Sequence, residues 1–202
     1  ATYADATAGV TVNLAITTAQ ETGAGADQLI GIENLTGGNG NDTLSGNAGA
    51  NNINGGGGDD LIMGGAGNDT LAGGANGAAG DTVSYADATA RVTVSLAVTA
   101  AQNTGGAGSD VLSGFENLEG SAFGDQLTGS TGNNVIRGGA GADRIIGGDG
   151  TDYLYGGAGA DTFVFAANSN SRVGSARDVI FDLELGDVLD FSAIDANTVT
   201  RG

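Results

Sequence analysis

The feature that most constrains this chain is a nine-residue pattern, Gly-Gly-x-Gly-x-Asp-x-U-x, in which U is a large apolar residue. It occurs in eleven nine-residue copies and one stretched copy between residues 22 and 164. The first six positions are turn formers, because Gly permits positive φ and Asp or Asn tolerates turn geometry. The last three positions alternate and suit a very short strand. Such a strand cannot bury an apolar face alone, so the pattern predicts stacked coils.

The apolar position of the pattern predicts the core. Turn and strand alternate every nine residues, so two copies make a coil of about eighteen residues, and every second copy lies on the same edge. Stacking then aligns the apolar side chains into interior ladders. In the first half these are Leu29, Leu35, Leu44, Ile53, Ile62, Leu71 and Val83, and in the second half Leu112, Leu118, Leu127, Ile136, Ile145, Leu154 and Phe163.

A longer repeat contains the short one. The segment from Tyr3 to Gly23 recurs from Tyr85 to Gly105 at an offset of 82, and GIENLTG at Gly31 recurs as GFENLEG at Gly114 at an offset of 83. A match of this length implies a duplicated structural unit. The alternating segments 10–16 and 92–98 belong to this unit and are interpreted as wider coils. We therefore predict a first super-repeat over residues 1–83, a second over residues 84–164, and a capping segment over residues 165–202.

The charge pattern excludes several classes of function. Asp and Glu number 24 against six Lys and Arg, for a net charge of −18, which disfavours nucleic acid and anionic membranes as partners. The absence of His and Cys argues against a zinc site and against the usual bases and nucleophiles, so we do not expect an enzyme. Apolar runs are too short for a membrane span, and no signal peptide is recognised.

The acidic residues recur at the same position of the repeat, so stacking of the coils aligns them into columns on the two edges. One edge is predicted to carry Asp27, Asp42, Asp60, Asp81, Asp110, Asp125, Asp143 and Asp161, and the other Asn51, Asp69, Asn134 and Asp152. Carboxylates stacked in this way repel each other unless a cation lies between them. Together with carbonyls from the Gly turns they form an all-oxygen environment, which suits Ca²⁺ better than the strictly octahedral Mg²⁺.

These residues resemble the repeats-in-toxin (RTX) family of hemolysin-type calcium-binding repeats. The resemblance implies an all-β fold, a parallel β-roll or β-solenoid with a C-terminal β cap, in which turns of adjacent coils share multiple calcium ions. It implies that the turn Asp residues above are side-chain ligands. The implied carbonyl donors are Gly38, Gly40, Gly56, Gly58, Gly65, Gly67, Gly139, Gly141, Gly148, Gly150, Gly157 and Gly159.

Several positions depart from the pattern. Asn51 and Asn134 replace the ligand Asp, Phe123 replaces the fourth-position Gly, and the segments GIENLT and GFENLE lack the turn. We expect roughly eight calcium sites from the stacking of same-edge pairs. Because the irregularities recur in both halves, we expect the ladder to be interrupted at the same coil in each half. Asp5 and Asp87 are interpreted as turn residues rather than as further ligands.

The residues after Phe165 predict a cap and set the functional hypotheses. The segment 178–195 contains two alternating strands and resembles the segment that follows the β-roll in serralysin-type proteases. The resemblance implies a secreted bacterial module, exported by a type I pathway, that folds on calcium binding at the cell surface or outside the cell. Surface-layer, adhesive or other extracellular assembly is expected, with neighbouring copies or other cell-surface components as partners. The alternative is the C-terminal region of a secreted hydrolase whose catalytic domain lies outside this sequence, which we expect to be a fragment.

Overall fold

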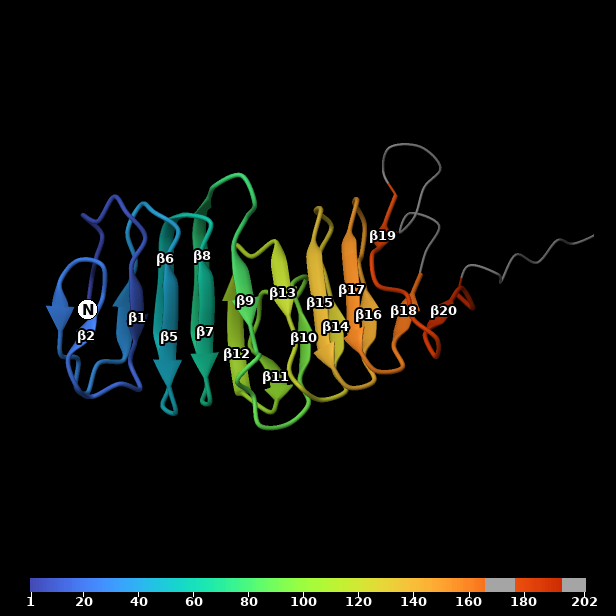
Figure 1. Ribbon diagram of the computed structural model, residues 1–202, viewed down its shortest axis with the longest axis horizontal. Helices are drawn as coiled ribbons and strands as arrows, with labels where there is room; N and C mark the ends of the chain where they lie inside the picture. The colour runs from blue at the N-terminus through green and yellow to red at the C-terminus, as the bar shows by residue number, and fades with distance from the viewer. Residues whose placement is uncertain (166–176, 194–202) are drawn as a thin grey trace, which may run out of the picture.

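The chain folds into a parallel β-roll, which confirms the predicted fold class. The computed structural model describes residues 1–165 and 177–193, and within these ranges it contains strands and no helix. The strands stack side by side along a rod, with the N-terminal hairpin at one end and β20 at the other (Figure 1). With no helix among the described residues, none is long and apolar enough to cross a membrane.

Two faces of short strands enclose the core. The front face is one eight-stranded sheet in the order β1 (Thr11–Asn13), β5 (Thr43–Asn47), β7 (Leu61–Gly65), β9 (Thr82–Ser84), β13 (Asn117–Glu119), β15 (Val135–Ala140), β17 (Tyr153–Ala158) and β19 (Val179–Ile180). The back face consists of two five-stranded sheets. The first runs β4 (Asn34–Thr36), β6 (Asn52–Gly58), β8 (Thr70–Asn76), β12 (Gly108–Ser113) and β11 (Gln102–Gly105); the second runs β10 (Thr93–Ser95), β14 (Gln126–Thr128), β16 (Arg144–Ile146), β18 (Thr162–Val164) and β20 (Val188–Asp190). A hairpin of β2 (Gln20–Glu21) and β3 (Ala26–Asp27) lies at the N-terminal end.

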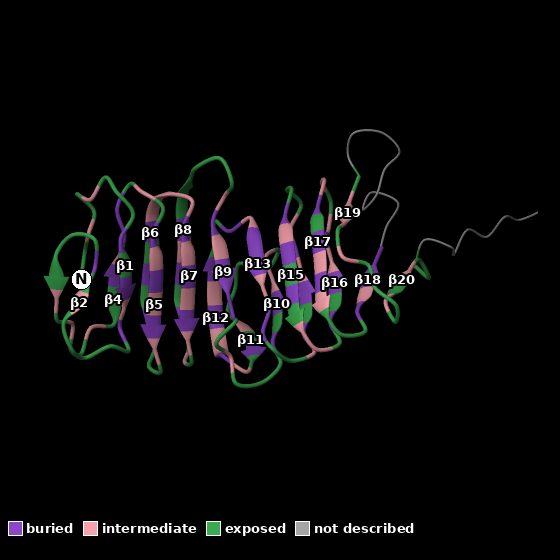
Figure 2. Ribbon diagram, viewed as in Figure 1, coloured by how far each residue is buried: buried purple, intermediate pink, exposed green. Residues whose placement is uncertain are grey.

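The register follows the nonapeptide. Leu44 pairs with Ile62 and Leu127 pairs with Ile145, so two nine-residue copies make one coil. Along β5 and β7, buried residues alternate with partly exposed ones (Figure 2). The predicted ladder residues are at most 3% exposed, except Leu29, which is partly buried against the core. At about 1.5–3 kcal/mol for each buried side chain, this ladder is the main apolar contribution to stability.

The segments expected to be wider coils enter the roll out of sequence order. β1 pairs with β5, and β10 pairs with β14, so in each half the chain first runs forward along the roll. It then returns through a hairpin, and β12 pairs with the earlier strand β8. The forward strand fills a position that a nonapeptide strand would otherwise take, with Val12 and Val94 buried in the core.

Equivalent strands of the two halves lie on opposite faces. Strands β4 to β9 alternate between back and front, and β12 then lies on the back, so β13 falls on the front although its counterpart β4 lies on the back. The repeating unit thus contains an odd number of half-coils. Each strand of the second half is therefore placed half a coil away from its counterpart in the first half.

The C-terminal described segment extends the roll by one coil. β19 pairs with β17 and β20 pairs with β18. Phe181 stacks on Tyr155 and Phe191 stacks on Phe165, both at 4.8 Å between ring centroids. Both aromatic rings of the last coil remain about half exposed. The rest of the predicted capping segment, residues 166–176 and 194–202, lies outside the described residues.

Candidate metal-binding edges

Most strands of the roll are preceded by a polar residue, although β1 and β10 follow Val10 and Val92, and Asp110 lies within β12. Pairing aligns these polar residues into one column on each edge. Edge I, which precedes the front strands, carries Asp42, Asp60, Asp81, Glu116, Asn134, Asp152 and Asp178. Edge II, which precedes the back strands, carries Asn51, Asp69 and Asp110, and then Asp125, Asp143, Asp161 and Asp187.

The predicted distribution of ligands over the edges is therefore wrong for the second half. Asp110, Asp125, Asp143 and Asp161 lie on the edge of Asn51 and Asp69, whereas Asn134 and Asp152 lie on the edge of Asp42, Asp60 and Asp81. The physical reason is the odd number of half-coils in the duplicated unit, which moves every second-half residue to the other edge. Two copies of one sequence motif thus sit on opposite edges.

Hydrogen bonds tie each column together. The Oδ1 of Asp60 accepts the backbone N–H of Asp42, and the Oδ1 of Asp81 accepts that of Asp60, each at 2.8 Å. The same bond recurs along both edges with lengths between 2.7 and 3.1 Å. Each such carboxylate thereby uses one oxygen to hold the neighbouring coil. Its second oxygen is left for another partner.

The second oxygen has no protein partner at six of these positions. The buried Oδ2 atoms without a hydrogen bond are those of Asp60, Asp69, Asp81, Asp143, Asp152 and Asp161. These residues are at most 2% exposed. An unpaired, buried carboxylate oxygen is costly and requires a cation or a proton. The arrangement therefore fits a metal ion that binds oxygen ligands.

Burial changes the proton affinity of the same groups. It raises the pKa of Asp60 and Asp69 to about 6, and the pKa of Asp143 and Asp152 to about 7. The backbone N–H bond to each carboxylate acts in the opposite direction, and carboxylates in the same column add to the increase. Burial also raises the pKa of Asp81 and Asp161. Loss of hydration, more than repulsion, is thus the main cost of these carboxylates.

The turns before these residues have two conformations. In the open turns, the second and fourth glycines have φ between 85° and 149°, as in Gly56 and Gly58, a region that favours glycine. Ten of the twelve predicted carbonyl donors lie in open turns: Gly56, Gly58, Gly65, Gly67, Gly139, Gly141, Gly148, Gly150, Gly157 and Gly159. Gly38 and Gly40 have no positive φ.

In the closed turns, the side chain at the sixth position accepts a hydrogen bond from its own turn. Oδ2 of Asp42 accepts the N–H of Gly38 at 2.6 Å, and Oδ2 of Asp125 accepts that of Ser121 at 2.5 Å. Asn51 and Asn134 accept equivalent bonds through Oδ1. Each closed turn is the first nonapeptide turn after an irregular segment on its edge. The carboxylates in these turns are already partnered, unlike those in the open turns.

Carbonyl oxygens reach the unpaired carboxylates at the first glycine of the pattern. A Cβ on Gly55 would collide with both Asp60 Oδ2 and the Gly73 carbonyl oxygen, and one on Gly138 would collide with Asp143 Oδ2 and the Gly156 carbonyl. The absent side chain therefore leaves room for two oxygens from adjacent coils to converge. Among the described residues no group of three or more His, Cys, Asp or Glu could hold a metal ion, so carbonyls must supply part of any ligand set.

A comparison with protein families identifies the repeat. The model of the RTX calcium-binding nonapeptide repeat (4 copies) matches residues 36–71, 119–154 and 128–163. This chain contains RTX calcium-binding nonapeptide repeats. The matched ranges include Asp42, Asp60 and Asp69 in the first half, and Asp125, Asp143, Asp152 and Asp161 in the second. The RTX repeats make the chain a calcium-binding β-roll module. A search of curated proteins found no significant match.

One of the two Asn residues of the RTX pattern, Asn134, has a structural explanation. Asn134 Nδ2 donates to the Glu116 carbonyl oxygen at 2.7 Å, because the preceding turnless coil presents an acceptor at this point. At the other positions the preceding coil presents an N–H, which an Asp oxygen accepts. An amide supplies the donor that a carboxylate lacks. Asn51 occupies the matching place after Glu33, but its buried Nδ2 has no hydrogen-bond partner.

Sequence reasoning missed four acidic residues that contact the RTX coils. Glu116 Oε2 accepts the N–H of Asp81 at 3.1 Å, although its segment lacks the nonapeptide turn. Asp178 and Asp187 accept the N–H groups of Asp152 and Asp161, and Asp182 accepts those of Gly156 and Gly157. The signal for Asp178 and Asp187 was an Asp directly before a short alternating strand. Glu116 carried no comparable signal.

Tyr and Thr hydroxyls cap two of the predicted ligands. Asp110 Oδ2 accepts the Tyr85 hydroxyl at 3.1 Å and the Thr104 hydroxyl at 3.2 Å, where edge II is interrupted before Asp125. Asp27, in the N-terminal hairpin, accepts the equivalent bonds from Tyr3 at 3.0 Å and Thr22 at 2.8 Å. On edge II the column is thus broken between Asp110 and Asp125, where the two back sheets meet, and the predicted interruption of the calcium ladder at the same coil in each half stays a prediction. On edge I, Glu116 continues the column.

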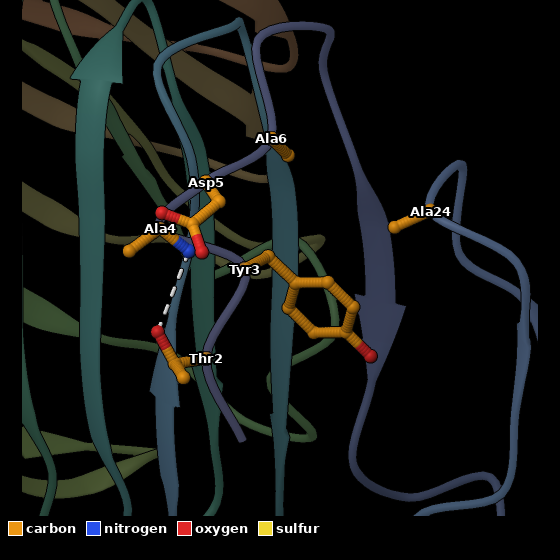
Figure 3. A pocket seen from close by; sticks show the side chains of 6 residues that line it. All are labelled: Thr2, Tyr3, Ala4, Asp5, Ala6 and Ala24. Carbon is orange, nitrogen blue, oxygen red and sulfur yellow. Dashed lines mark hydrogen bonds between the residues drawn. The ribbon is translucent and has the colours of Figure 1, made fainter.

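The turn residues Asp5 and Asp87 are exposed. Asp5 lines a hollow of about 380 Å³ at the N-terminal end of the roll. Figure 3 shows its carboxylate beside Ala4, while the Tyr3 ring points to the side on which Ala24 lies. Asp5 is thus an exposed turn residue, unlike the buried carboxylates of the two columns.

Proposed function

We propose that this RTX β-roll is a calcium-dependent structural module of an exported bacterial protein, which folds when it meets calcium outside the cell. The observation that carries the proposal is the set of six buried Asp Oδ2 atoms without a partner. They occur on both edges and are spread over both halves of the chain. A metal-free fold would keep all six desolvated at neutral pH.

The proposed coupling of folding to calcium follows from where the ligands lie in the sequence. Converging oxygens such as those of Asp60 and Gly73 come from adjacent coils, so an unfolded chain has no preformed site. Bound calcium would neutralise the buried carboxylates. Since the chain carries a net charge of −18, self-repulsion also favours the expanded state when calcium is scarce. Extracellular calcium modules bind with dissociation constants of roughly 10⁻⁴–10⁻³ M, which suits a switch between the cytosol and the outside.

We further propose a surface-layer, adhesive or other extracellular assembly as its setting, with a structural rather than a catalytic role. The rod of stacked coils supports a spacer or a lateral contact (Figure 1). Its abundant Asp residues are engaged in bonds between coils, which leaves them poorly suited to act as catalytic acids or bases. Association with a secreted hydrolase remains compatible with the same module.

The experiment compares far-UV circular dichroism of the chain in excess chelator and in millimolar calcium near neutral pH. We expect strand signal to develop only with calcium and to disappear reversibly when chelator is added. Magnesium at the same concentration serves as the control, and should be far less effective because it requires strict octahedral geometry. Equal strand content with chelator and with calcium would refute the proposal.

A further inference from the structure

The junction between the two halves brings a turnless coil against Asp81. β9 pairs with β13, with Thr82 opposite Asn117, so Asp81 and Glu116 are neighbours on edge I. Asp81 is fully buried. Its Oδ1 accepts the N–H of Asp60 at 2.8 Å, and its Oδ2 has no hydrogen-bond partner. An unpaired carboxylate oxygen therefore faces a coil that has no Gly-rich turn.

Other oxygens converge on the same place. A Cβ on Gly73 would collide with the Gly114 carbonyl oxygen and with Asp81 Oδ2. The same combination of a carbonyl and an unpaired carboxylate oxygen is found at Gly55 and Gly138, where two nonapeptide turns meet. Gly114 thus takes the place of a nonapeptide first glycine. Glu116, whose Oε2 accepts the Asp81 N–H at 3.1 Å, takes the place of the next Asp.

We propose that Asp81, the Gly114 carbonyl and Glu116 form a calcium site outside the nonapeptide pattern, which joins the two halves of the roll. The ligand set consists of hard oxygen atoms, as Ca²⁺ requires. Without an ion, the two adjacent carboxylates repel each other.

This site would make edge I continuous where edge II is interrupted. On edge II, Asp110 Oδ2 accepts hydrogen bonds from the Tyr85 and Thr104 hydroxyls. These bonds give the oxygen its partners without neutralising its charge. On edge I, Asn134 follows Glu116 and donates to its carbonyl oxygen, so the next gap carries an amide donor. The geometry therefore assigns the ion to the side of Glu116 that faces Asp81.

The test compares Glu116→Gln with Glu119→Gln. Gln keeps an oxygen that can accept the Asp81 N–H, so a purely structural role of Glu116 would survive the substitution. Glu119 lies on the same strand β13, and its substitution makes the same change in charge. The readouts are the number of calcium ions per chain by native mass spectrometry, and the calcium midpoint of the circular dichroism signal.

We expect Glu116→Gln to bind one ion fewer than the unmodified chain and to fold at a higher calcium concentration, while Glu119→Gln keeps the full number. Equal ion numbers in all three proteins would overturn the inference. If Glu116→Gln does not fold, Glu116→Asp decides: a full ion count supports the carboxylate site, and a failure to fold contradicts it. The inference rests on the proposed calcium dependence, whose own failure would appear as calcium-independent folding of the unmodified chain.

Discussion

Protons should replace calcium in part, because both neutralise the buried carboxylates. The perturbation is acidification of the metal-free chain in excess chelator, from about pH 7.5 to about pH 5. In the folded chain the pKa values of Asp60, Asp69, Asp143 and Asp152 are raised from 3.8 to about 6 or about 7. The folded state then binds protons more tightly than the unfolded state. Stability of the metal-free fold therefore rises as the pH falls below about 7, and the full gain is present below about 3.8, the unfolded value.

The size of the effect follows from the pKa increases. Each unit of pKa increase corresponds to about 1.4 kcal/mol of folding free energy. Solvent screening at the edges of the roll reduces the contribution of each group to about 1 kcal/mol. The four carboxyl groups together then contribute about 4 kcal/mol. Since domains of this kind are stable by about 5–15 kcal/mol, such a change can move the metal-free chain between unfolded and partly folded states.

The assay follows far-UV circular dichroism of calcium-free protein against pH, staying above the isoelectric point of about 4.1. We expect strand signal to increase on acidification in chelator and to be lost when the pH is raised again. With saturating calcium the sign should reverse, because protons compete with the ion for the same oxygens. A metal-free signal that is flat or that falls on acidification would refute the reasoning.

Three further predictions concern single positions. Gly55→Ala should raise the calcium midpoint of folding on the order of tenfold or more, because the new Cβ collides with Asp60 Oδ2 and the Gly73 carbonyl. Gly57→Ala is the control: its Cβ meets only ordinary contacts, so this variant should match the unmodified chain. Similar calcium titrations for both variants would contradict the view that the missing side chain at Gly55 leaves room for the converging oxygens. Leu127→Ala removes a fully buried ladder residue and should cost about 2–5 kcal/mol in urea unfolding with saturating calcium, and a cost near zero would show that the ladder is not the core. Tyr85→Phe leaves Asp110 Oδ2 with only the Thr104 hydroxyl and should cost about 1–2 kcal/mol in the same assay. Tyr153→Phe, at a residue that is 43% exposed, should be neutral, and equal effects of the two substitutions would argue against a stabilising bond from the Tyr85 hydroxyl.

Local periodicity explains why much of the roll was predictable. Every nine residues repeat a turn and a strand, so the coil of two copies, the apolar ladder and the columns of acidic residues all follow from short-range spacing. Leu44 above Ile62 and Asp42 above Asp60 are examples. Within a half, the edge of each ligand was predictable as well, because consecutive nonapeptides alternate between edges without interruption.

The routing of the irregular segment was decided by tertiary structure. The sequence contains both copies of the duplication, but the edge on which the second copy lies depends on how many half-coils the chain between β9 and β13 forms. That number depends on β10 pairing forward with β14 and β12 pairing back with β8. These pairings join strands far apart in the sequence, and no local pattern encodes them.

The role of Glu116 depends on the same routing. In sequence GFENLE is a repeat without its turn, and nothing distinguishes its Glu from the one in GIENLT. Only the pairing of β9 with β13 brings Glu116 to Asp81. The sequence by itself determined the coil, its core and its calcium chemistry, because these arise from a nine-residue period. Tertiary structure decided which carboxylates share an edge and which one joins the halves, because those depend on contacts between distant strands.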